Sequence, residues 1–396
     1  MESIIDNKNL KTEGAKKQLW FRDKMPLVKL VNKQIKENLI FKDKVIAICM
    51  HIEPKTAFWI EGLLDGGAKH IYLVGCIGTT KKETAAYLSS LDNITVLGKE
   101  DDDFETHQKY LSMIMENKID IFLDNGGSLI LAHNKSNVNW NPIGANEETR
   151  SGKLYIEKNN VKANYPIIVI DDSPVKQLLE NAIGVGQSVV DGFMRSTSLL
   201  VGGKNILVIG YGFCGSGVAT KFKGLGANVL VFDRDPIKRL KALADGYIVD
   251  NFENLLKKAQ VIITVTGSWD VINEKHIQYL KDGVILANSG HYGFEINVES
   301  LKKKAIEIVE VKKGIERLEI DKKSIFLLEN ATPLNLSAGD GNPIEIMDIG
   351  LSLQSLSAIR LLNDYNVKEK TLIKGLQKVP KDIDKHVSEN MLDLLK

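Results

Sequence analysis

The chain has 396 residues, which is long enough for two domains with separate hydrophobic cores. Its 52 Lys and Arg residues nearly balance 51 Asp and Glu residues, so no basic field favours nucleic acid or lipid. Three scattered cysteines without a CxxC pair argue against a disulfide framework, and no apolar run has membrane-spanning length. We therefore expect a cytoplasmic protein with no nucleic-acid or membrane partner.

The first half of the chain alternates strand-like and helix-like segments. Residues 56–67 have helical spacing of apolar residues and end in glycine. This alternation is typical of a parallel α/β layer. Apolar runs predict strands at residues 44–50, 70–75, 94–98, 119–127 and 165–172.

A second series of strands follows a segment at 184–205 that we expect to be helical. Residues 308–328 alternate and contain turn residues, which predicts short antiparallel strands. Residues 344–365, after Pro343, form a long amphipathic stretch and predict one helix. The strands expected in this series lie at residues 205–210, 228–233, 261–267 and 283–290.

A glycine-rich turn connects the first strand of this second series to a helix. Gly210, Gly212 and Gly215 have GxGxxG spacing, and Asp233 ends the next strand about 20 residues later. The glycines allow backbone N–H groups to approach a pyrophosphate at the helix N-terminus. Asp233 would accept hydrogen bonds from the adenosine ribose and so select NAD, whereas Arg234 could host a 2′-phosphate.

Five further segments resemble the S-adenosylhomocysteine hydrolase family. They are "MHIEPKTAFWIEGLLDGGA" (50–68), "DNGG" (124–127), "NEETRSG" (146–152), "GQSVVDGFMRSTSLLVGGKN" (186–205) and "TGSWDVINEKHIQYLKDGVILANSGHYGFEI" (266–296). The resemblance runs co-linearly from about residue 40 to 385.

The resemblance implies an α/β fold in which a Rossmann-type NAD domain is inserted into an α/β substrate domain. The substrate domain would comprise residues 1–183 and 345–396, and the NAD domain with its hinge helices would comprise residues 184–344. It also implies a homodimer or homotetramer, a small nucleoside substrate and no metal ion. The family's C-terminal extension, which reaches a neighbour's NAD, is missing, so we expect NAD to be held more loosely.

The family's reaction is a hydrolysis that uses NAD as a recycled internal oxidant. Oxidation of the ribose 3′-hydroxyl acidifies the 4′ carbon–hydrogen bond, a base removes that proton, and the 5′ thiolate leaves. Water then adds, and the hydride returns to C3′. The resemblance therefore implies cleavage of S-adenosylhomocysteine or of a variant nucleoside thioether.

The family motifs assign roles to particular residues. Catalytic roles are implied for His51, Asn125, Lys176, Glu180 and His291. Substrate contacts are implied for Glu53, Lys55, Thr56, Glu148, Thr149, Asn342 and Met347. Besides the glycine turn, Asp233 and Arg234, cofactor contacts are implied for Asn181, Phe213, Cys214, Thr266, Gly267, Asn288, Gly290, His291 and Asn335.

The chain departs from the family pattern at several of these positions. Asn125 replaces the second of two aspartates, and an amide cannot act as a general base. Glu180 is one methylene longer than the family's aspartate, although its spacing from Lys176 places both on one helix face. Lys55 and Asn342 replace groups that read the adenine amino edge.

These departures leave three functions open. The first is hydrolysis of a nucleoside thioether, and the second is an NAD-dependent nucleoside 3′-oxidoreductase or epimerase that omits thioether cleavage. The third is a catalytically silent NAD-binding regulator. An ammonium at Lys55 is a donor only, so it favours a 6-oxo purine over adenine; in the alternative interpretation Lys55 points to solvent.

Overall fold

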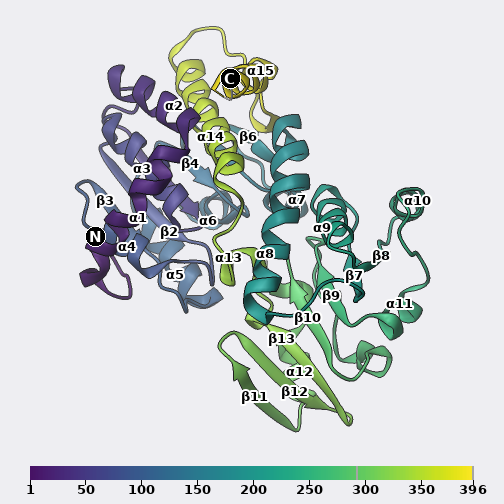
Figure 1. Ribbon diagram of the computed structural model, residues 1–396. Coiled ribbons are helices and arrows are strands. Elements are labelled where there is room, and N and C mark those ends of the chain that lie inside the picture. The colour runs from purple at the N-terminus through teal and green to yellow at the C-terminus, as the bar shows by residue number, and fades with distance from the viewer. Residues whose placement is uncertain (291–292, 395–396) are drawn as a thin grey trace. The chain divides into compact units, whose positions relative to one another are not determined.

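The computed structural model describes residues 1–290 and 293–394, which form two compact units (Figure 1). Unit 1 comprises Met1–Lys176 and Ile344–Lys396, and unit 2 comprises Gln177–Pro343. The first boundary lies seven residues before the expected position of 183. The reason is that Ala182 packs on unit 2: a Cβ on Gly217 would lie 1.9 Å from the Ala182 carbonyl oxygen, so the two backbones are in direct contact.

Unit 1 is built on a seven-stranded, wholly parallel sheet with the order β14-β6-β5-β4-β1-β2-β3. The five strands expected from apolar runs are confirmed, whereas β5 and β14 were not predicted because "GANE" and "GLQK" contain no such run. The strands are β1 Val45–Met50, β2 His70–Gly75, β3 Ile94–Leu97, β4 Ile121–Asp124, β5 Gly144–Glu147, β6 Pro166–Val169 and β14 Gly375–Lys378.

Helices cover both faces of this sheet, because alternate residues of a buried strand point to opposite sides. Ile46 and Ile48 of β1 belong to one core, and Ala47 and Cys49 belong to the other. The helices are η1 Lys8–Leu10, α1 Lys11–Lys24, α2 Pro26–Glu37, α3 Pro54–Asp65, α4 Lys82–Leu88, α5 Phe104–Met115, α6 Ser128–Lys135, α7 Arg150–Lys158, η2 Ile170–Asp172, α14 Ile344–Asn366 and α15 Lys381–Leu394.

The long helix expected after Pro343 is confirmed as α14, which packs against α2 and α3 (Figure 1). The Trp59 indole N–H of α3 donates to the Ser355 hydroxyl of α14 at 2.7 Å, so the two helices are fixed by a buried polar contact. This contact ties the C-terminal part of the chain into the core formed by its N-terminal half.

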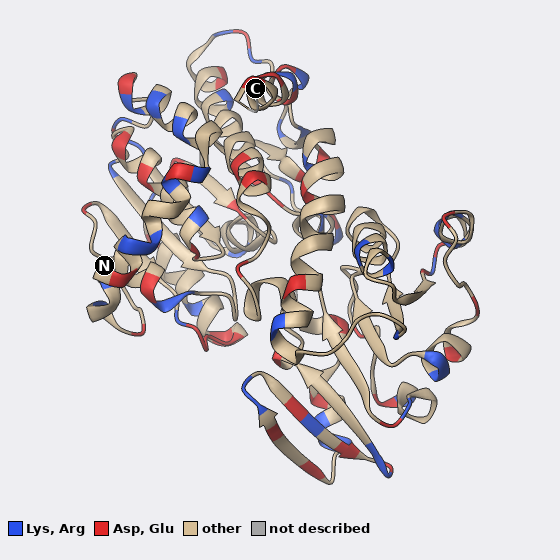
Figure 2. Ribbon diagram, in the orientation of Figure 1, with Lys and Arg blue, Asp and Glu red and all other residues tan. Residues whose placement is uncertain are grey.

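Unit 2 contains a second seven-stranded sheet with the order β11-β12-β13-β10-β9-β7-β8. Strands β7 to β10 are parallel, and β11, β12 and β13 pair antiparallel with one another, as expected. Figure 2 shows acidic and basic residues along both strands of the β11–β12 hairpin. The strands are β7 Asn205–Ile209, β8 Asn228–Phe232, β9 Val261–Thr264, β10 Val284–Asn288, β11 Glu307–Lys312, β12 Ile315–Ile320 and β13 Lys323–Leu328.

The segment expected to be helical over 184–205 is helical only to Thr197. Ser198 adopts a left-handed φ of 56°, which ends α8, and Gly203 at φ 77° completes the turn into β7. The helices of unit 2 are α8 Val185–Thr197, α9 Phe213–Gly224, α10 Pro236–Ala244, α11 Phe252–Lys258, η4 Glu274–Tyr279, η5 Gly293–Glu295, α12 Val298–Lys304, η6 Glu329–Ala331 and α13 Leu334–Ser337. The helix η3, Lys176–Gly184, crosses the unit boundary.

Across the described part of the chain, none of the helices has the length and apolar character that a membrane span requires.

Candidate active site

The glycine turn of unit 2 has the backbone geometry that a bound pyrophosphate requires. Gly210 has a φ of 104°, and a Cβ there would lie 2.5 Å from the Val265 carbonyl oxygen. A Cβ on Gly215 would lie 2.0 Å from the Gly210 carbonyl oxygen, so α9 packs closely on the turn. Gly212 caps α9 and has open space where its Cβ would be. The first-turn N–H groups of α9 therefore fit an anion.

Asp233 follows β8 directly and lies beside this turn. Its Oδ2 accepts a hydrogen bond from the Tyr211 backbone N–H at 2.7 Å, and its Oδ1 accepts one from the Asp235 N–H at 2.9 Å. The neighbouring Arg234 donates to the Ser268 hydroxyl at 3.1 Å. The carboxylate is thus fixed next to the glycine turn, which suits a ribose diol and fits NAD.

A second loop of unit 2 is held by a buried carboxylate that the sequence reasoning missed. Glu295 accepts hydrogen bonds from the backbone N–H groups of Thr266 and Gly267 and from the Thr266 hydroxyl, at 2.7 to 3.1 Å. Burial raises the pKa of Glu295, while these hydrogen bonds lower it. Gly290 leaves room for the carboxylate, since a Cβ there would lie 1.8 Å from Glu295 Oε1.

The remaining implied contacts of unit 2 lie on several elements. Both polar groups of the Asn288 side chain are hydrogen-bonded within unit 2. Its amide donates to the Gly290 and Ala331 carbonyls, and its Oδ1 accepts from the Thr264 hydroxyl. The Ser188 hydroxyl connects Asn335 and Asn342, which lie 3.3 and 2.9 Å from it. His291 lies outside the described residues. Phe213 and Cys214 begin α9, and Glu180 and Asn181 lie on η3.

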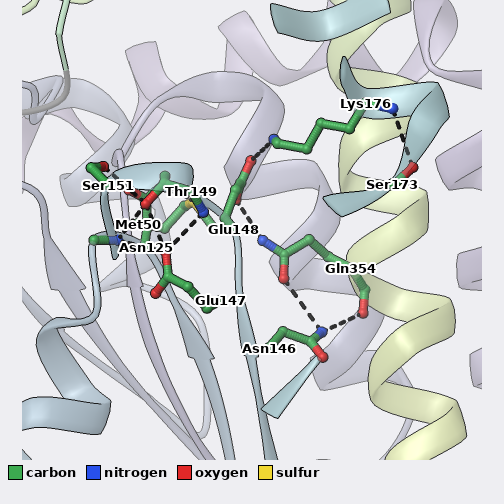
Figure 3. Close-up of polar contacts among 11 residues, drawn as sticks. Met50, Asn125, Asn146, Glu147, Glu148, Thr149, Ser151, Ser173, Lys176 and Gln354 are labelled. Atoms are coloured by element: carbon green, nitrogen blue, oxygen red, sulfur yellow. Dashed lines mark hydrogen bonds and ion pairs between the residues drawn. The ribbon is translucent and has the colours of Figure 1, made fainter. Parts of the chain in front are cut away.

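In unit 1, Lys176 forms a buried ion pair with Glu148 (Figure 3). Lys176 Nζ lies 3.0 Å from Glu148 Oε1, and the Gln354 amide donates to Glu148 Oε2 at 2.5 Å. Gln354 is held in turn by the Asn146 amide, which donates to its backbone carbonyl at 2.8 Å. An ammonium and a carboxylate are therefore fixed side by side on residues far apart in the sequence.

The segment that begins at Lys176 is π-helical through Gly184, not α-helical as the four-residue spacing of Lys176 and Glu180 assumed. A π-helix is wider than an α-helix, and short π-helical segments are frequent at functional sites. Glu180 is buried.

Two loops at the carboxyl ends of β4 and β5 meet through hydrogen bonds (Figure 3). The Gly126 N–H donates to the Thr149 hydroxyl at 3.2 Å, and Gly126 and Gly127 both donate to the Glu147 carboxylate. Asn125, at the start of the first loop, is 3% exposed, and its amide contacts Met50 Sδ at 3.4 Å. The loops bring Asn125 and Thr149 to one edge of the sheet.

His51 follows β1, and its ring orientation is set by Thr79. The Thr79 hydroxyl lies 2.8 Å from His51 Nδ1 and donates its single proton to the Cys76 carbonyl at 2.9 Å. With its proton engaged there, Thr79 accepts from His51, which favours the tautomer with the proton on Nδ1. In the neutral ring, the lone pair is therefore on Nε2.

Lys55 is buried rather than directed to solvent, so the solvent-facing alternative is wrong. Its side chain is 1% exposed, and its Nζ lies 2.8 Å from Glu53 Oε2. Glu53 also caps α3 by accepting from the Lys55 backbone N–H, and Thr56 follows within the first turn. Met347 is partly buried and packs against the hydrophobic core that contains Phe58 and Trp59 of α3. The carboxylate of Glu53 compensates the burial of this ammonium, which would be costly if the charge were unpaired.

Four residues with clear roles in this geometry were not predicted from sequence: Thr79, Glu147, Glu295 and Gln354. Each acts through a partner distant in sequence, so no local spacing marks them. Glu147 precedes Glu148 directly, and a pair of adjacent glutamates at a strand end was the only signal available.

Comparisons with known proteins agree with this geometry. The family profile described as "S-adenosyl-L-homocysteine hydrolase, NAD binding domain" matches residues 181–341, which include the glycine turn and Asp233. NAD is therefore the cofactor that unit 2 takes.

Full-length relatives extend the match to unit 1. An S-inosyl-L-homocysteine hydrolase from Methanopyrus kandleri is 36% identical over 99% of this chain and 93% of its own. An adenosylhomocysteinase from Aquifex aeolicus is 35% identical, over 100% and 95% of the two chains. An S-inosyl-L-homocysteine hydrolase from Methanocaldococcus jannaschii is 36% identical, over 91% and 88%. With this identity across both units, the chain belongs to the S-adenosylhomocysteine hydrolase family and is an NAD-dependent enzyme.

Proposed function

We propose that the enzyme hydrolyses S-inosyl-L-homocysteine by transient oxidation of the ribose 3′-hydroxyl. Relatives of nearly equal identity carry the names of both the inosyl and the adenosyl enzyme, so overall similarity does not choose between the substrates. The choice rests on the chemistry of unit 1.

The buried ammonium of Lys55 is the observation that supports the inosyl substrate. A lysine ammonium only donates hydrogen bonds, and hypoxanthine offers an acceptor at O6 where adenine offers an amino donor. A site built around such a bond discriminates strongly, because the wrong base leaves a buried polar group unpaired. The pairing of Lys55 with Glu53 at 2.8 Å holds the ammonium in place.

The oxidation step would use the Lys176–Glu148 pair. We assign to Lys176, once its ammonium has lost a proton and become a neutral amine, the acceptance of the 3′-hydroxyl proton. Glu148 would accept hydrogen bonds from the ribose hydroxyls, with Thr149 beside it. Bound NAD supplies hydride acceptance and return. Gln354 keeps the Glu148 carboxylate oriented, since it donates to the oxygen that Lys176 does not contact.

The cleavage step would use His51. Because Nδ1 donates to Thr79, Nε2 is the ring atom that can exchange a proton with the 5′ sulfur. The neutral Nε2 would accept the 4′ proton as that carbon–hydrogen bond breaks, and the imidazolium so formed would donate the proton to the leaving 5′ thiolate and become neutral again.

The nucleoside 3′-oxidoreductase is a second candidate, and Asn125 is the observation that favours it. Its side chain is buried, and among the described residues its Oδ1 has no hydrogen-bond partner. An amide cannot remove the 4′ proton. If no other group does so, oxidation would proceed without release of a thiol.

Thiol release tests the proposal and separates the two candidates. The purified enzyme with NAD is given S-inosyl- or S-adenosyl-L-homocysteine, and free homocysteine is measured with a thiol reagent. We expect faster release from the inosyl compound, and Lys55→Gln should remove most of that preference. Lys153→Gln, which breaks another partly buried ion pair of unit 1, should retain it. Reduction of bound NAD without any thiol would favour the oxidoreductase.

A further inference from the structure

Glu147 occupies the centre of the polar network in unit 1, although it is completely buried. As the last residue of β5, it accepts hydrogen bonds from four donors, of which Figure 3 labels Thr149. They are the backbone N–H groups of Gly126 at 3.1 Å, Gly127 at 2.8 Å and Thr149 at 2.8 Å, and the Thr149 hydroxyl at 2.7 Å. Within the described residues, no cationic side chain pairs with it.

The neighbouring strand presents a second buried carboxylate in register with the first, since Asp124 pairs with Glu147 across β4 and β5. Asp124 accepts from the Asn125 N–H at 3.0 Å and the Ile130 N–H at 2.9 Å. Burial and the Asp124 charge raise the pKa of Glu147, and burial raises that of Asp124. Backbone N–H groups thus take the place of water around both carboxylates.

One glycine makes room for the Glu147 side chain, and a second shapes the turn that donates to it. A Cβ on Gly152 would lie 2.1 Å from Glu147 Oε1. Gly127 has a left-handed φ of 73°, and its own Cβ would lie 3.3 Å from the Gly152 carbonyl oxygen. Gly152 therefore leaves the space that the carboxylate occupies, and the left-handed Gly127 belongs to the turn whose N–H groups donate to it.

We propose that Glu147 is a positioning residue for the ribose of the substrate. Glu147 accepts hydrogen bonds both from the turn that follows Asn125 and from Thr149. It therefore fixes the loop after β4 relative to the loop after β5. Its carboxylate oxygens are already engaged by four protein donors, so it acts through Thr149 and the 125–127 turn. This role rests on the proposed function of Glu148 and Thr149 as ribose contacts.

Two variants disturb this carboxylate by different means. Glu147→Gln replaces one acceptor oxygen with an amide NH2 group, a donor that faces N–H donors. Gly152→Ala keeps the charge of Glu147, but the added methyl group displaces its carboxylate from the position where it accepts the four hydrogen bonds. Glu61→Gln is the matched control, because Glu61 is another partly buried carboxylate of unit 1, hydrogen-bonded to Arg22 and Tyr87.

The measurement is calorimetric affinity of the NAD-loaded enzyme for inosine and for 2′,3′-dideoxyinosine. We expect the wild type and Glu61→Gln to prefer inosine by about tenfold or more, the scale of a hydrogen bond to a charged group. Glu147→Gln and Gly152→Ala should both lose most of this preference. Urea unfolding of all three variants checks that the loss does not simply follow stability.

Retained preference in Glu147→Gln and Gly152→Ala would overturn the positioning role while leaving the proposed function intact. If Glu61→Gln also lost the preference for inosine, the positioning role would again be overturned, because loss of any partly buried carboxylate contact in unit 1 would then be enough to abolish that preference. A wild-type enzyme that binds neither nucleoside would contradict the proposed function itself, and the role assigned to Glu147 would fall with it.

Discussion

Single side chains of this enzyme act in pairs whose members are distant in sequence. Lys176 with Glu148 and His51 with Thr79 each combine a group that can exchange a proton with a partner that fixes its orientation. Sequence reasoning named Lys176, Glu148 and His51 through family motifs, because those residues lie in recognisable segments. It could not find Thr79, since only the fold brings the end of β1 next to the turn after β2.

Thr79 offers a direct test of the His51 tautomer. Thr79→Val removes the acceptor for Nδ1–H, so we expect kcat to fall by about tenfold or more and the pH–rate profile to change. Thr79→Ser keeps the hydroxyl and should restore activity. Thr95→Val is the control, because Thr95 contacts His70 at 2.9 Å in an analogous pair far from the site residues. Equal activity of the Val and Ser variants at Thr79 would refute this role.

Among the helices, α9 shows most clearly why a sequence motif predicts a site. An added Cβ at Gly210 or Gly215 would clash with backbone atoms, and Gly212 caps α9. The glycine spacing located this turn together with the strand before it, the helix after it and Asp233. The strand β5 shows the opposite. Its four residues are wholly buried yet mostly small or polar; the Asn146 amide donates to the Gln354 carbonyl, and Glu147 accepts from backbone N–H groups of a distant turn. No hydrophobic pattern could reveal it.

Gly215→Ala tests the close packing of α9 on the glycine turn. The added Cβ would meet the Gly210 carbonyl oxygen at 2.0 Å, so the turn must open, and we expect NAD affinity to fall about tenfold or more. Gly224→Ala lies on the same helix with open space at its Cβ and should bind NAD normally, with slightly raised stability. Fluorescence titration with NAD compares them, and equal affinities would contradict the assigned geometry.

Asp348 makes the stability of unit 1 depend on pH through the N-terminus of α2. Its carboxylate accepts from the Leu27 and Val28 N–H groups, and burial raises its pKa from 3.8 to about 6. The folded state therefore binds this proton more tightly, which adds stability below about pH 4 that is lost as the pH rises to about 6.

We expect Asp348→Asn to lack this dependence. Relative to the variant, the wild type should lose about 2 kcal/mol of unfolding free energy between about pH 4 and 6.5. Urea unfolding at the two pH values measures the difference. Parallel pH profiles for the two proteins would show that Asp348 does not titrate in this range.

The whole molecule consists of unit 1, made from both ends of the chain, and unit 2, the NAD-binding part inserted between them. Alternating strands and helices predicted two α/β series, but they could not show that residues after 343 return to the first sheet. That return depends on β14, which pairs parallel with β6, and on the Trp59–Ser355 contact. The family resemblance, rather than periodicity, gave this organisation.

NAD should protect the two units unequally, because every cofactor contact described above lies in unit 2. Hydrogen exchange with and without NAD should show the largest slowing in the glycine turn and at Thr266 and Gly267. Backbone amides of β1 to β4 should change little. Equal protection of both sheets would contradict the assignment of cofactor binding to unit 2.

The most direct test of the proposed substrate is a competition between the two thioethers. The enzyme with NAD receives S-inosyl- and S-adenosyl-L-homocysteine in equal concentration, and inosine and adenosine are quantified at low conversion. Their ratio gives the ratio of the two kcat/KM values. Our account predicts that inosine predominates by about tenfold or more, because the buried Lys55 ammonium donates to O6. Predominance of adenosine would contradict it.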